Sequence, residues 1–524
     1  MKLEYLYIDG YKGLKGLELR FKEQHSPVAV DFLVGKNGSG KSSVLEALGL
    51  IFTRIMQNEL PGFAFALQYR MPDGVRVHVR PQKEHFRDET GTRRRLWVEI
   101  ERGDERERLY AIPDEYLPDR LICCCSGTNG SMEEILLASP RASLASDLYD
   151  LSDQEEGEVR REAEEIFRYY ERLETNPRAF FVDDVTSRFL LPVLFAVFPA
   201  DVWDEREKET IRRYCGWREK LLKRLDTGIV PVAFSIRVDE EKLEQEPDTP
   251  QLNILRRLIG EEDRINDDTV HRLAVERAKE GGEAPSEVLA VFLYQKWEDV
   301  QAGWYHPRLQ EYVAGNPFLL LSALLGAYRE GVIRSVHFFY CFGKKNGGYE
   351  RGIHEIEALS DGELMWISRI GLALMAQAHC GDNTLFLYDE PDVHFNDDWN
   401  RDFIQCLYEI CGERGHEFLI ATHSTLMLTD AMYEQVYLLE NLPGGRTKME
   451  EVNISTFAAG RDEISRQVFQ AESIGAFAEG FVQERIRTND PEKIEETIGK
   501  MGPGYRRFCM YEQLYSLLEA KEEG

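Results

Sequence analysis

Short alternations of apolar and polar residues occupy the first part of the chain and predict β-strands. Two such segments cover residues 3–8 and 15–21, and a third predicted strand, the mostly apolar segment 28–34, runs directly into a glycine-rich loop. Alternation with a period of two places successive side chains on opposite faces, as in a half-buried strand. After the loop, apolar residues recur at helical spacing from Ser42 to about Met56. The pattern therefore predicts a strand, a loop and a helix in direct succession.

A second group of alternating segments follows this helix and predicts an antiparallel meander. The segments are 65–71, 75–80, 95–101 and 107–112. Between the first two, Pro72-Asp-Gly74 has the composition of a tight turn. Three adjacent cysteines, Cys123, Cys124 and Cys125, then close this part of the chain. Adjacent side chains on a strand point to opposite faces and cannot converge on one metal ion, so we interpret the cysteines as part of a buried strand.

From about residue 131 to about 315 the pattern becomes mainly helical and strongly charged. Residues 229–237 form an apolar run that predicts one strand inside this region. No heptad repeat is sustained, so a long coiled coil is not expected. We predict that 131–315 is a large, mainly helical insertion between an N-terminal lobe, 1–130, and a C-terminal lobe, 316–453.

Strands and helices alternate again after the insertion. The predicted elements are, in order, a helix at 318–329, a strand at 332–340, a helix at 360–379, a strand at 384–388, a helix at 394–412 and a strand at 418–422. Alternation of this kind is typical of an α/β sheet with parallel strands. The last segment, 454–524, is predicted to be helical. The predicted fold class is α/β, with a mixed sheet flanked by helices.

Charge restricts the partners that the chain can have. Its 524 residues include 64 basic and 93 acidic side chains, which give a formal net charge of −29. Such a surface repels the phosphate backbone, so we expect weak binding to generic DNA. Nucleic acid would have to use a local basic patch. The best candidates are Arg93-Arg-Arg95 and a predicted helix with Arg212, Arg213, Arg218, Lys220, Lys223 and Arg224.

Hydropathy and cysteine usage indicate a cytoplasmic protein. No apolar stretch reaches the roughly 18 residues that span a bilayer, and the N-terminus lacks the uninterrupted apolar segment of a signal peptide. We therefore expect no membrane partner. The nine cysteines include no pair at zinc-binding spacing. Reduced thiols in the cytoplasm are the simplest interpretation.

The glycine-rich loop after the third strand fits a site for the phosphates of ATP. It reads Gly35-Lys-Asn-Gly-Ser-Gly-Lys-Ser42, between a strand and a helix. Backbone N–H groups and the helix N-terminus would hold the phosphates. Lys41 would reach the β- and γ-phosphates, and Ser42 would bind Mg²⁺. The predicted nucleotide-binding residues of this loop are Gly35, Asn37, Gly38, Gly40, Lys41, Ser42 and Ser43.

Two later strands end in residues that suit hydrolysis. In Thr384-Leu-Phe-Leu-Tyr-Asp-Glu-Pro391, Asp389 follows a buried strand, at the end where α/β sheets bind ligands. Asp389 could hold Mg²⁺, and Glu390 could act as general base toward water. His423 ends the next predicted strand and could hydrogen-bond the γ-phosphate. The predicted catalytic residues are Glu390 and His423, and the predicted metal ligands are Ser42 and Asp389.

A further motif, Leu359-Ser-Asp-Gly-Glu363, opens a predicted helix and supplies a second anion site. A serine hydroxyl, a glycine backbone and a helix N-terminus are its binding groups. We therefore add Ser360 and Gly362 to the predicted nucleotide-binding residues. Two phosphate sites for one ATP imply a homodimer or a higher homo-oligomer, in which each subunit completes the other's nucleotide site.

These motifs, in this order, resemble those of ABC-type ATPases of the RecF/SMC/overcoming-lysogenization class. Gly35–Ser42 is similar to Walker A, Leu359–Glu363 to the signature motif, Leu385–Glu390 to Walker B, and Asp392–Asn396 to the D-loop, with His423 as the switch histidine. The motifs that carry this resemblance lie within residues 1–60 and 350–430. The resemblance implies an ATP-hydrolysing head domain that dimerises. The signature reads Ser-Asp-Gly-Glu, which favours the SMC-like branch over transporters. The Q-loop residue of this family could be Gln68 or Asn129.

Three shorter segments resemble ATPases encoded beside restriction, Septu or retron antiphage systems. They are Ser126-Gly-Thr-Asn129, Thr456-Phe-Ala-Ala and Gly502-Pro-Gly-Tyr-Arg506. This resemblance implies an ATPase that regulates a separate effector, with an HNH-type nuclease as the candidate and a reverse transcriptase with its RNA–DNA product as another partner. The alternatives are a RecF- or SMC-like DNA repair clamp and, less favoured, a transporter ATPase subunit.

Overall fold

The computed structural model describes most of the two predicted ATPase lobes and part of the region between them. The described residues are 1–24, 28–57, 59–82, 95–127, 130–132, 177–196, 229–246, 250–259, 287–293, 316–342, 352–381, 383–412, 415–442, 446–451, 455–471 and 475–522. The chain divides into two compact units, Met1–Ala458 and Ala459–Gly524.

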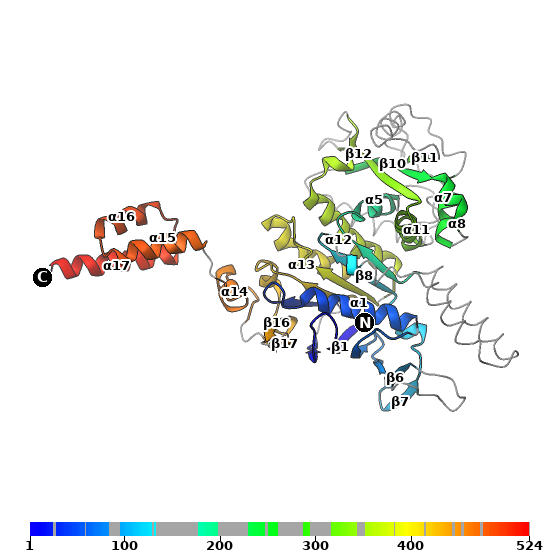
Figure 1. Ribbon diagram of the computed structural model, residues 1–524, viewed down its shortest axis with the longest axis horizontal. Coiled ribbons are helices and arrows are strands. Elements are labelled where there is room, and N and C mark those ends of the chain that lie inside the picture. Colours follow the sequence, from blue (N-terminus) through cyan, green and yellow to red (C-terminus); the bar gives the residue numbers. More distant parts are fainter. Residues whose placement is uncertain are drawn as a thin grey trace. The chain divides into compact units, whose positions relative to one another are not determined.

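A seven-stranded sheet forms the centre of the larger unit (Figure 1). Its strand order is β17-β16-β3-β15-β14-β8-β9. The strands are β3 (Ala29–Val34), β8 (Arg120–Cys125), β9 (Ala179–Val182), β14 (Thr384–Asp389), β15 (Glu417–Ala421), β16 (Val436–Leu442) and β17 (Arg446–Glu451). All neighbours are parallel except β16 and β17, which are antiparallel. The predicted mixed sheet is confirmed, and its parallel strands end at one edge.

Helices cover both faces of this sheet because its central strands are apolar on both sides. Leu385 and Leu387 of β14 belong to a core that includes the apolar face of α1 (Lys41–Met56). Phe386 and Tyr388 point to the other face, where the Tyr388 ring lies 6.2 Å from that of Phe403 in α13 (Asp397–Cys411). Continuous apolar runs of this kind are typical of parallel strands buried on both faces.

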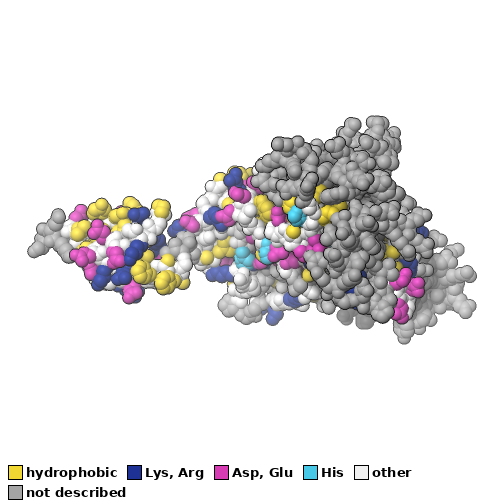
Figure 2. Space-filling view, turned by 90° about the horizontal axis from the view of Figure 1, so that it is seen from above, with side chains coloured by type: hydrophobic (Ala, Val, Ile, Leu, Met, Phe, Trp, Pro, Cys, Tyr) yellow, Lys and Arg dark blue, Asp and Glu magenta, His cyan; other side chains and the backbone are white. Residues whose placement is uncertain are grey.

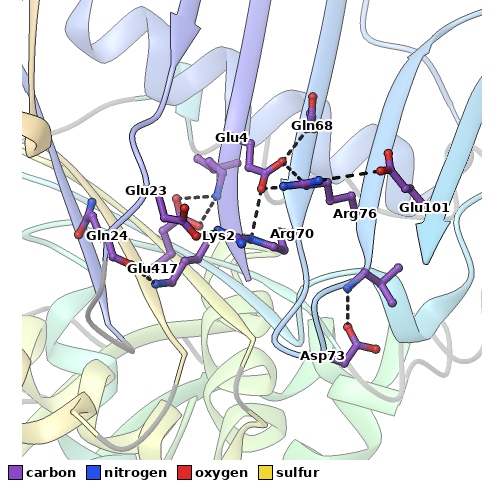
Figure 3. Close-up of polar contacts among 12 residues, drawn as sticks. Lys2, Glu4, Glu23, Gln24, Gln68, Arg70, Asp73, Arg76, Glu101 and Glu417 are labelled. Carbon is purple, nitrogen blue, oxygen red and sulfur yellow. Dashed lines mark hydrogen bonds and ion pairs between the residues drawn. The ribbon is translucent and has the colours of Figure 1, made fainter. Parts of the chain in front are cut away.

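The predicted antiparallel meander is confirmed and is part of a six-stranded sheet of order β2-β1-β4-β5-β6-β7. Its strands are β1 (Lys2–Asp9), β2 (Leu17–Arg20), β4 (Ala64–Arg70), β5 (Arg76–Pro81), β6 (Leu96–Arg102) and β7 (Glu105–Leu109). One face packs into the core, and the other carries a charged network in which Glu4 pairs with Arg70 and Arg76 (Figure 3).

Part of the predicted insertion pairs with strands of the two lobes. β9 extends the central sheet beside β8. β10 (Ile229–Asp239) and β11 (Glu287–Leu293) form an antiparallel four-stranded sheet with β12 (Ile333–Phe342) and β13 (His354–Glu355). The described residues between 131 and 315 therefore contain three strands as well as the helices α5, α7 and α8. The domain boundaries at 131 and 315 stay a prediction.

The remaining elements connect or cover these sheets. The helices are α5 (Ser187–Ala196), α7 (Glu240–Gln245), α8 (Pro250–Leu258), α11 (Pro317–Arg329) and α12 (Asp361–His379). Short 3₁₀ turns are η1 (Asp114–Tyr116), η4 (Ile356–Ala358), η5 (Met427–Asp430) and η6 (Tyr433–Gln435). The predicted helix at 394–412 begins only after Asn396, whose side-chain oxygen accepts a hydrogen bond from Trp399 N at 2.8 Å and caps α13.

The smaller unit is helical, as predicted. It consists of α14 (Arg461–Gln467), α15 (Ala476–Arg487), α16 (Pro491–Lys500) and α17 (Tyr505–Glu522). Its small core is formed by Val482, Ile494, Ile498, Met510 and Leu514. Hydrophobic side chains also gather on its surface (Figure 2), where Phe477 is 88% exposed. Among the described helices of the chain, none is both long enough and apolar enough to span a membrane.

Candidate functional site

The glycine-rich loop between β3 and α1 has a backbone that requires its glycines. Gly38 and Gly40 have φ angles of 78° and 97°, in the left-handed region that favours glycine. A Cβ atom at Gly35 would lie 2.3 Å from the carbonyl oxygen of Leu439 in β16. The side chain of Asn441 on the same strand donates a hydrogen bond to Gly38 O at 2.7 Å. The loop is therefore held against β16 in a fixed shape.

The N-terminus of α1 is open to an anion. Its N-cap residue, Gly40, has no side chain to accept a hydrogen bond from the first turn, and that turn contains no acidic residue. Unpaired N–H groups and the helix dipole give such an end a partial positive charge. Nearby, Ser39 Oγ is buried and has no hydrogen-bond partner among the described residues. These features fit the phosphates of ATP.

Lys41 points back across the loop from the first position of α1. Its Nζ atom donates to Gly35 O at 3.1 Å and lies 2.6 Å from His423 Nε2. Burial lowers the pKa of Lys41, and burial together with the charge of Lys41 lowers the pKa of His423. A neutral imidazole can accept a hydrogen bond from the ammonium group. Within the described residues no carboxylate lies at ion-pair distance from Lys41, so an anionic phosphate would be its natural partner.

Ser42 and Asp389 bring two oxygen ligands together. Ser42 Oγ donates a hydrogen bond to Asp389 Oδ1 at 3.1 Å, although the residues are 347 positions apart in the chain. Burial raises the pKa of Asp389 to about 6, because it removes water from the carboxylate. A bound cation would favour the ionised form. A hydroxyl and a carboxylate at the edge of a sheet fit Mg²⁺, which prefers oxygen ligands.

Glu390 has a fixed backbone and a carboxylate that reaches into the site. Its φ angle is 49°, a left-handed conformation that costs a non-glycine residue on the order of 1–3 kcal/mol. Two hydrogen bonds hold it: Glu390 N donates to Ala421 O at 2.8 Å, and Ser126 Oγ donates to Glu390 O. The Glu390 carboxylate is 3.7 Å from His423 Nε2 and 42% exposed. It is therefore accessible to a water molecule.

Two further residues at the carboxyl edge of the central sheet were not predicted as site residues. Ser126 follows β8 directly and anchors the Glu390 backbone. Asp392 accepts a hydrogen bond from Thr422 Oγ1 at 2.8 Å, which links the turn after β14 to the end of β15. Burial raises the pKa of Asp392. The sequence contained a usable signal, because all the residues that directly follow parallel strands meet at one edge of the sheet.

The signature residues lie at the N-terminus of α12. Ser360 Oγ accepts a hydrogen bond from Glu363 N at 3.3 Å, and Ser360 N donates to Glu363 Oε2 at 2.8 Å, which is a capping box. A Cβ atom at Gly362 would lie 2.6 Å from His394 O, so this position favours glycine. Within the described residues, the contacts of Ser360 and Gly362 do not reach the loop of the same chain.

Of the other predicted residues, the two Q-loop candidates lie apart from this cluster or outside the described residues, whereas Asn37 and Ser43 belong to the loop and to α1. Gln68 donates to Glu4 Oε2 at 2.6 Å within the charged network of the six-stranded sheet (Figure 3). Asn129, the other Q-loop candidate, and the basic residues from Arg212 to Arg224 lie outside the described residues. Asn37 is exposed in the loop, and Ser43 is half-buried in the first turn of α1.

Comparisons with known proteins found a matching family model and several similar solved structures. Residues 1–174 match the family model described as "AAA ATPase domain", over 174 of 524 residues. Similar solved structures include an SMC head domain from Thermotoga maritima, with 12% identity, 87% of this chain and 100% of that chain covered, and a TM-score of 0.33. Another is an Smc head domain with an extended coiled coil bound to the C-terminal domain of ScpA, derived from Pyrococcus furiosus. Its identity is 14%, its TM-score is 0.30, and the match covers 86% of this chain and 96% of that chain.

A third solved structure is an SmcHead bound to the C-winged helix domain of ScpA, with 13% identity and a TM-score of 0.31. The match covers 86% of this chain and 97% of that chain. No curated protein matches the chain. The segment that matches the ATPase family model contains the whole glycine-rich loop and the strand and helix on either side of it.

Proposed function

We propose that the chain is a Mg²⁺-dependent ATPase. The observation that carries this proposal is the meeting of Ser42 with Asp389, and of Lys41 with His423, at the carboxyl edge of the central sheet. Bound MgATP would supply an electrophilic γ-phosphoryl group whose negative charge the metal partly neutralises. The loop glycines and the open end of α1 would orient the phosphates, and Lys41 would balance their charge.

Glu390 and His423 would act on the attacking water and on the reacting phosphoryl group, respectively. The exposed Glu390 carboxylate would accept a proton from the attacking water, and the backbone bonds to Ala421 and Ser126 would keep it in position. His423 would exchange its contact with Lys41 for a hydrogen bond to the γ-phosphate. Asp389 and Ser42 would hold Mg²⁺, which keeps the Asp389 carboxylate ionised.

We further propose that two chains close around ATP and that each completes the site of the other. Ser360, at the exposed N-terminus of α12, would contact the γ-phosphate held by the partner's loop. Ser360 Oγ also lies 2.9 Å from Glu363 Oε2 and would have to exchange this contact for the phosphate. ATP would drive closure only through its higher affinity for the closed state.

A mixture of two inactive variants tests the shared site. Ser360→Arg is expected to leave ATP binding to one subunit intact but to block closure, whereas Lys41→Ala is expected to weaken ATP binding. In a mixed dimer, one composite site carries both defects and the other pairs an intact loop with an intact signature. ATPase activity in the mixture should therefore rise above that of either variant alone.

The control for this experiment is Ser360→Thr, which keeps the hydroxyl cap whose loss alone would cost about 1 kcal/mol. It should retain dimerisation and turnover. Dimers of defined composition, purified through two different tags, allow the activity to be assigned. If such mixed dimers hydrolyse no more ATP than the separate variants, two independent composite sites are ruled out.

For the biological role, we propose a cytoplasmic regulator of a separate effector in antiphage defence. The support is the resemblance of Ser126-Gly-Thr-Asn129, Thr456-Phe-Ala-Ala and Gly502-Pro-Gly-Tyr-Arg506 to Septu- and retron-associated ATPases. An HNH-type nuclease is the candidate effector, and a reverse transcriptase with its RNA–DNA product is a second candidate partner. The alternative is a RecF- or SMC-like DNA repair clamp.

Binding to random duplex DNA distinguishes these two roles. With a net charge of −29, the isolated protein is expected to bind such DNA weakly at physiological salt, with or without ATP. The measurement is a fluorescence anisotropy titration over a series of salt concentrations. Tight binding by the protein alone would favour the clamp, and reversing the charges of Arg212, Arg213, Lys220 and Arg224 would then test whether that patch is the DNA-binding surface.

A further inference from the structure

The pairing of β12 with β13 brings a histidine and two glutamates to one face of the four-stranded sheet. Phe339 pairs with Glu355 and Tyr340 with His354 in antiparallel register. Glu357 follows two residues after Glu355, in the 3₁₀ turn η4. Side chains two positions apart share a face of a strand, and opposed residues of an antiparallel pair are neighbours. The pairing therefore places Glu355, and the turn that carries Glu357, beside His337.

The side chains of these three residues converge. His337 Nδ1 lies 2.5 Å from Glu355 Oε1, and His337 Nε2 lies 3.1 Å from Ser335 Oγ. One ligand atom from each of His337, Glu355 and Glu357 lies within 4.8 Å of the other two. Donors that are about 2.0–2.2 Å from one ion can be at most about 4.4 Å apart. A small rotation of the exposed Glu357 side chain would therefore complete a set of three ligands.

An orphaned hydroxyl group on the same face is a second indication of a ligand. Ser235 of β10 pairs directly with His337, so the two side chains are neighbours on one face. Ser235 Oγ is fully buried and has no hydrogen-bond partner within the described part of the chain. Buried polar groups are normally hydrogen-bonded, and a water molecule on a bound ion would provide a partner.

The charges of the cluster also favour a cation. Two carboxylates lie beside a single imidazole, and Glu357 forms no ion pair with any described residue. A divalent ion would neutralise the Glu357 carboxylate and would replace the proton between His337 and Glu355.

We propose that His337, Glu355 and Glu357 bind one divalent transition-metal ion of the Zn²⁺ class, with water completing the coordination. An imidazole nitrogen and carboxylate oxygens suit Zn²⁺ and similar ions. Mg²⁺ prefers six oxygen ligands, so this site differs from the proposed ATP site in the metal that it selects.

Glu357 would connect the bound ion to the signature motif. It lies three residues before Ser360, in the turn that leads into α12, whereas His337 belongs to β12. The ion would cross-link this turn to the sheet and restrict its motion. This regulatory consequence rests on the proposed role of Ser360, but binding of the metal does not.

Zinc binding by two matched variants tests the proposal. Glu357→Gln removes one ligand and one charge from an exposed position, and Glu330→Gln makes the same change at the exposed end of α11, away from the cluster. Chelator-treated full-length proteins are titrated with Zn²⁺ in excess Mg²⁺ and without nucleotide, against a competing chromophoric chelator. We expect the wild type and Glu330→Gln to bind one more Zn²⁺ per chain than Glu357→Gln, or to bind it at least tenfold more tightly. Equal zinc binding by all three proteins would overturn the proposal.

Hydrogen exchange gives a readout that is independent of ATP hydrolysis. Zn²⁺ should slow amide exchange in the segment from Glu355 to Ser360 in the wild type and in Glu330→Gln, but not in Glu357→Gln. Absence of protection in the wild type would mean that the ion does not bind between β12 and η4. The same samples are also titrated with ATP. Zinc binding reports on the cluster and ATP binding reports on the glycine-rich loop, so a failure of one proposal can be told from a failure of the other.

Discussion

Replacing Glu390 with glutamine is expected to slow ATP hydrolysis by about 10²–10⁴-fold, which is the usual contribution of a general base. The amide cannot accept the proton of the attacking water. ATP and Mg²⁺ should remain bound, because Lys41, Ser42 and Asp389 are unchanged. The closed dimer should therefore accumulate. Phosphate release under single-turnover conditions measures the rate, and size-exclusion chromatography with ATP measures the dimer.

The matched control is Glu484→Gln on the exposed surface of α15, which makes the same chemical change in the other unit. It should hydrolyse ATP at the wild-type rate. Glutamine resembles glutamate in size and in its tolerance of the left-handed backbone at position 390, so the fold should be retained. A Glu390→Gln protein with wild-type turnover would show that another group accepts the proton.

Replacing Lys41 with alanine is expected to weaken ATP binding by about 2–5 kcal/mol, or roughly 30- to several-thousand-fold. Loss of the ammonium group would leave buried phosphate charge without its partner. The protein should stay folded, because this change removes a charge whose burial is itself unfavourable, as its lowered pKa indicates. Isothermal titration calorimetry measures the affinity, and circular dichroism verifies the fold.

Lys15→Ala is the control for this prediction, because Lys15 is exposed after β1 and lies outside the loop. Its ATP affinity should equal that of the wild type. If folded Lys41→Ala protein bound ATP as tightly as this control, the assignment of Gly35–Ser42 as a phosphate-binding loop would be wrong.

Local sequence patterns predicted much of the central sheet and its motifs. The mostly apolar segments before Gly35, Asp389 and His423 predict buried strands, and parallel strands place the next residues at one edge of the sheet. The observed contacts between Ser42 and Asp389 and between Lys41 and His423 agree with that reasoning. The functional roles of these residues stay predictions.

Long-range pairing accounts for what the patterns did not predict. β9 adds to the edge of the central sheet, and β10 pairs with β12, about a hundred residues later in the chain. Such pairing depends on tertiary contacts that periodicity does not contain. The role of Ser126 was missed because its partner lies 264 residues away, although its place directly after a strand was a usable signal. Capping of α12 by Ser360 and Glu363 is local, and its serine-to-glutamate spacing could have been recognised.

The position of β3 has a consequence for how the chain is synthesised and folds. β3 lies between β15 and β16, so its edges are paired with strands made 388 residues later, as for Ala29 and Glu417, and 404 residues later, as for Phe32 and Val436. Until the ribosome has delivered residue 421, this strand has neither neighbour, and it lacks β16 until residue 442. Unpaired strand edges invite association with other chains. Native contacts over such sequence distances also slow folding. The nascent chain is therefore expected to depend on chaperones for most of its synthesis, and its N-terminal lobe should fold together with the C-terminal lobe rather than before it.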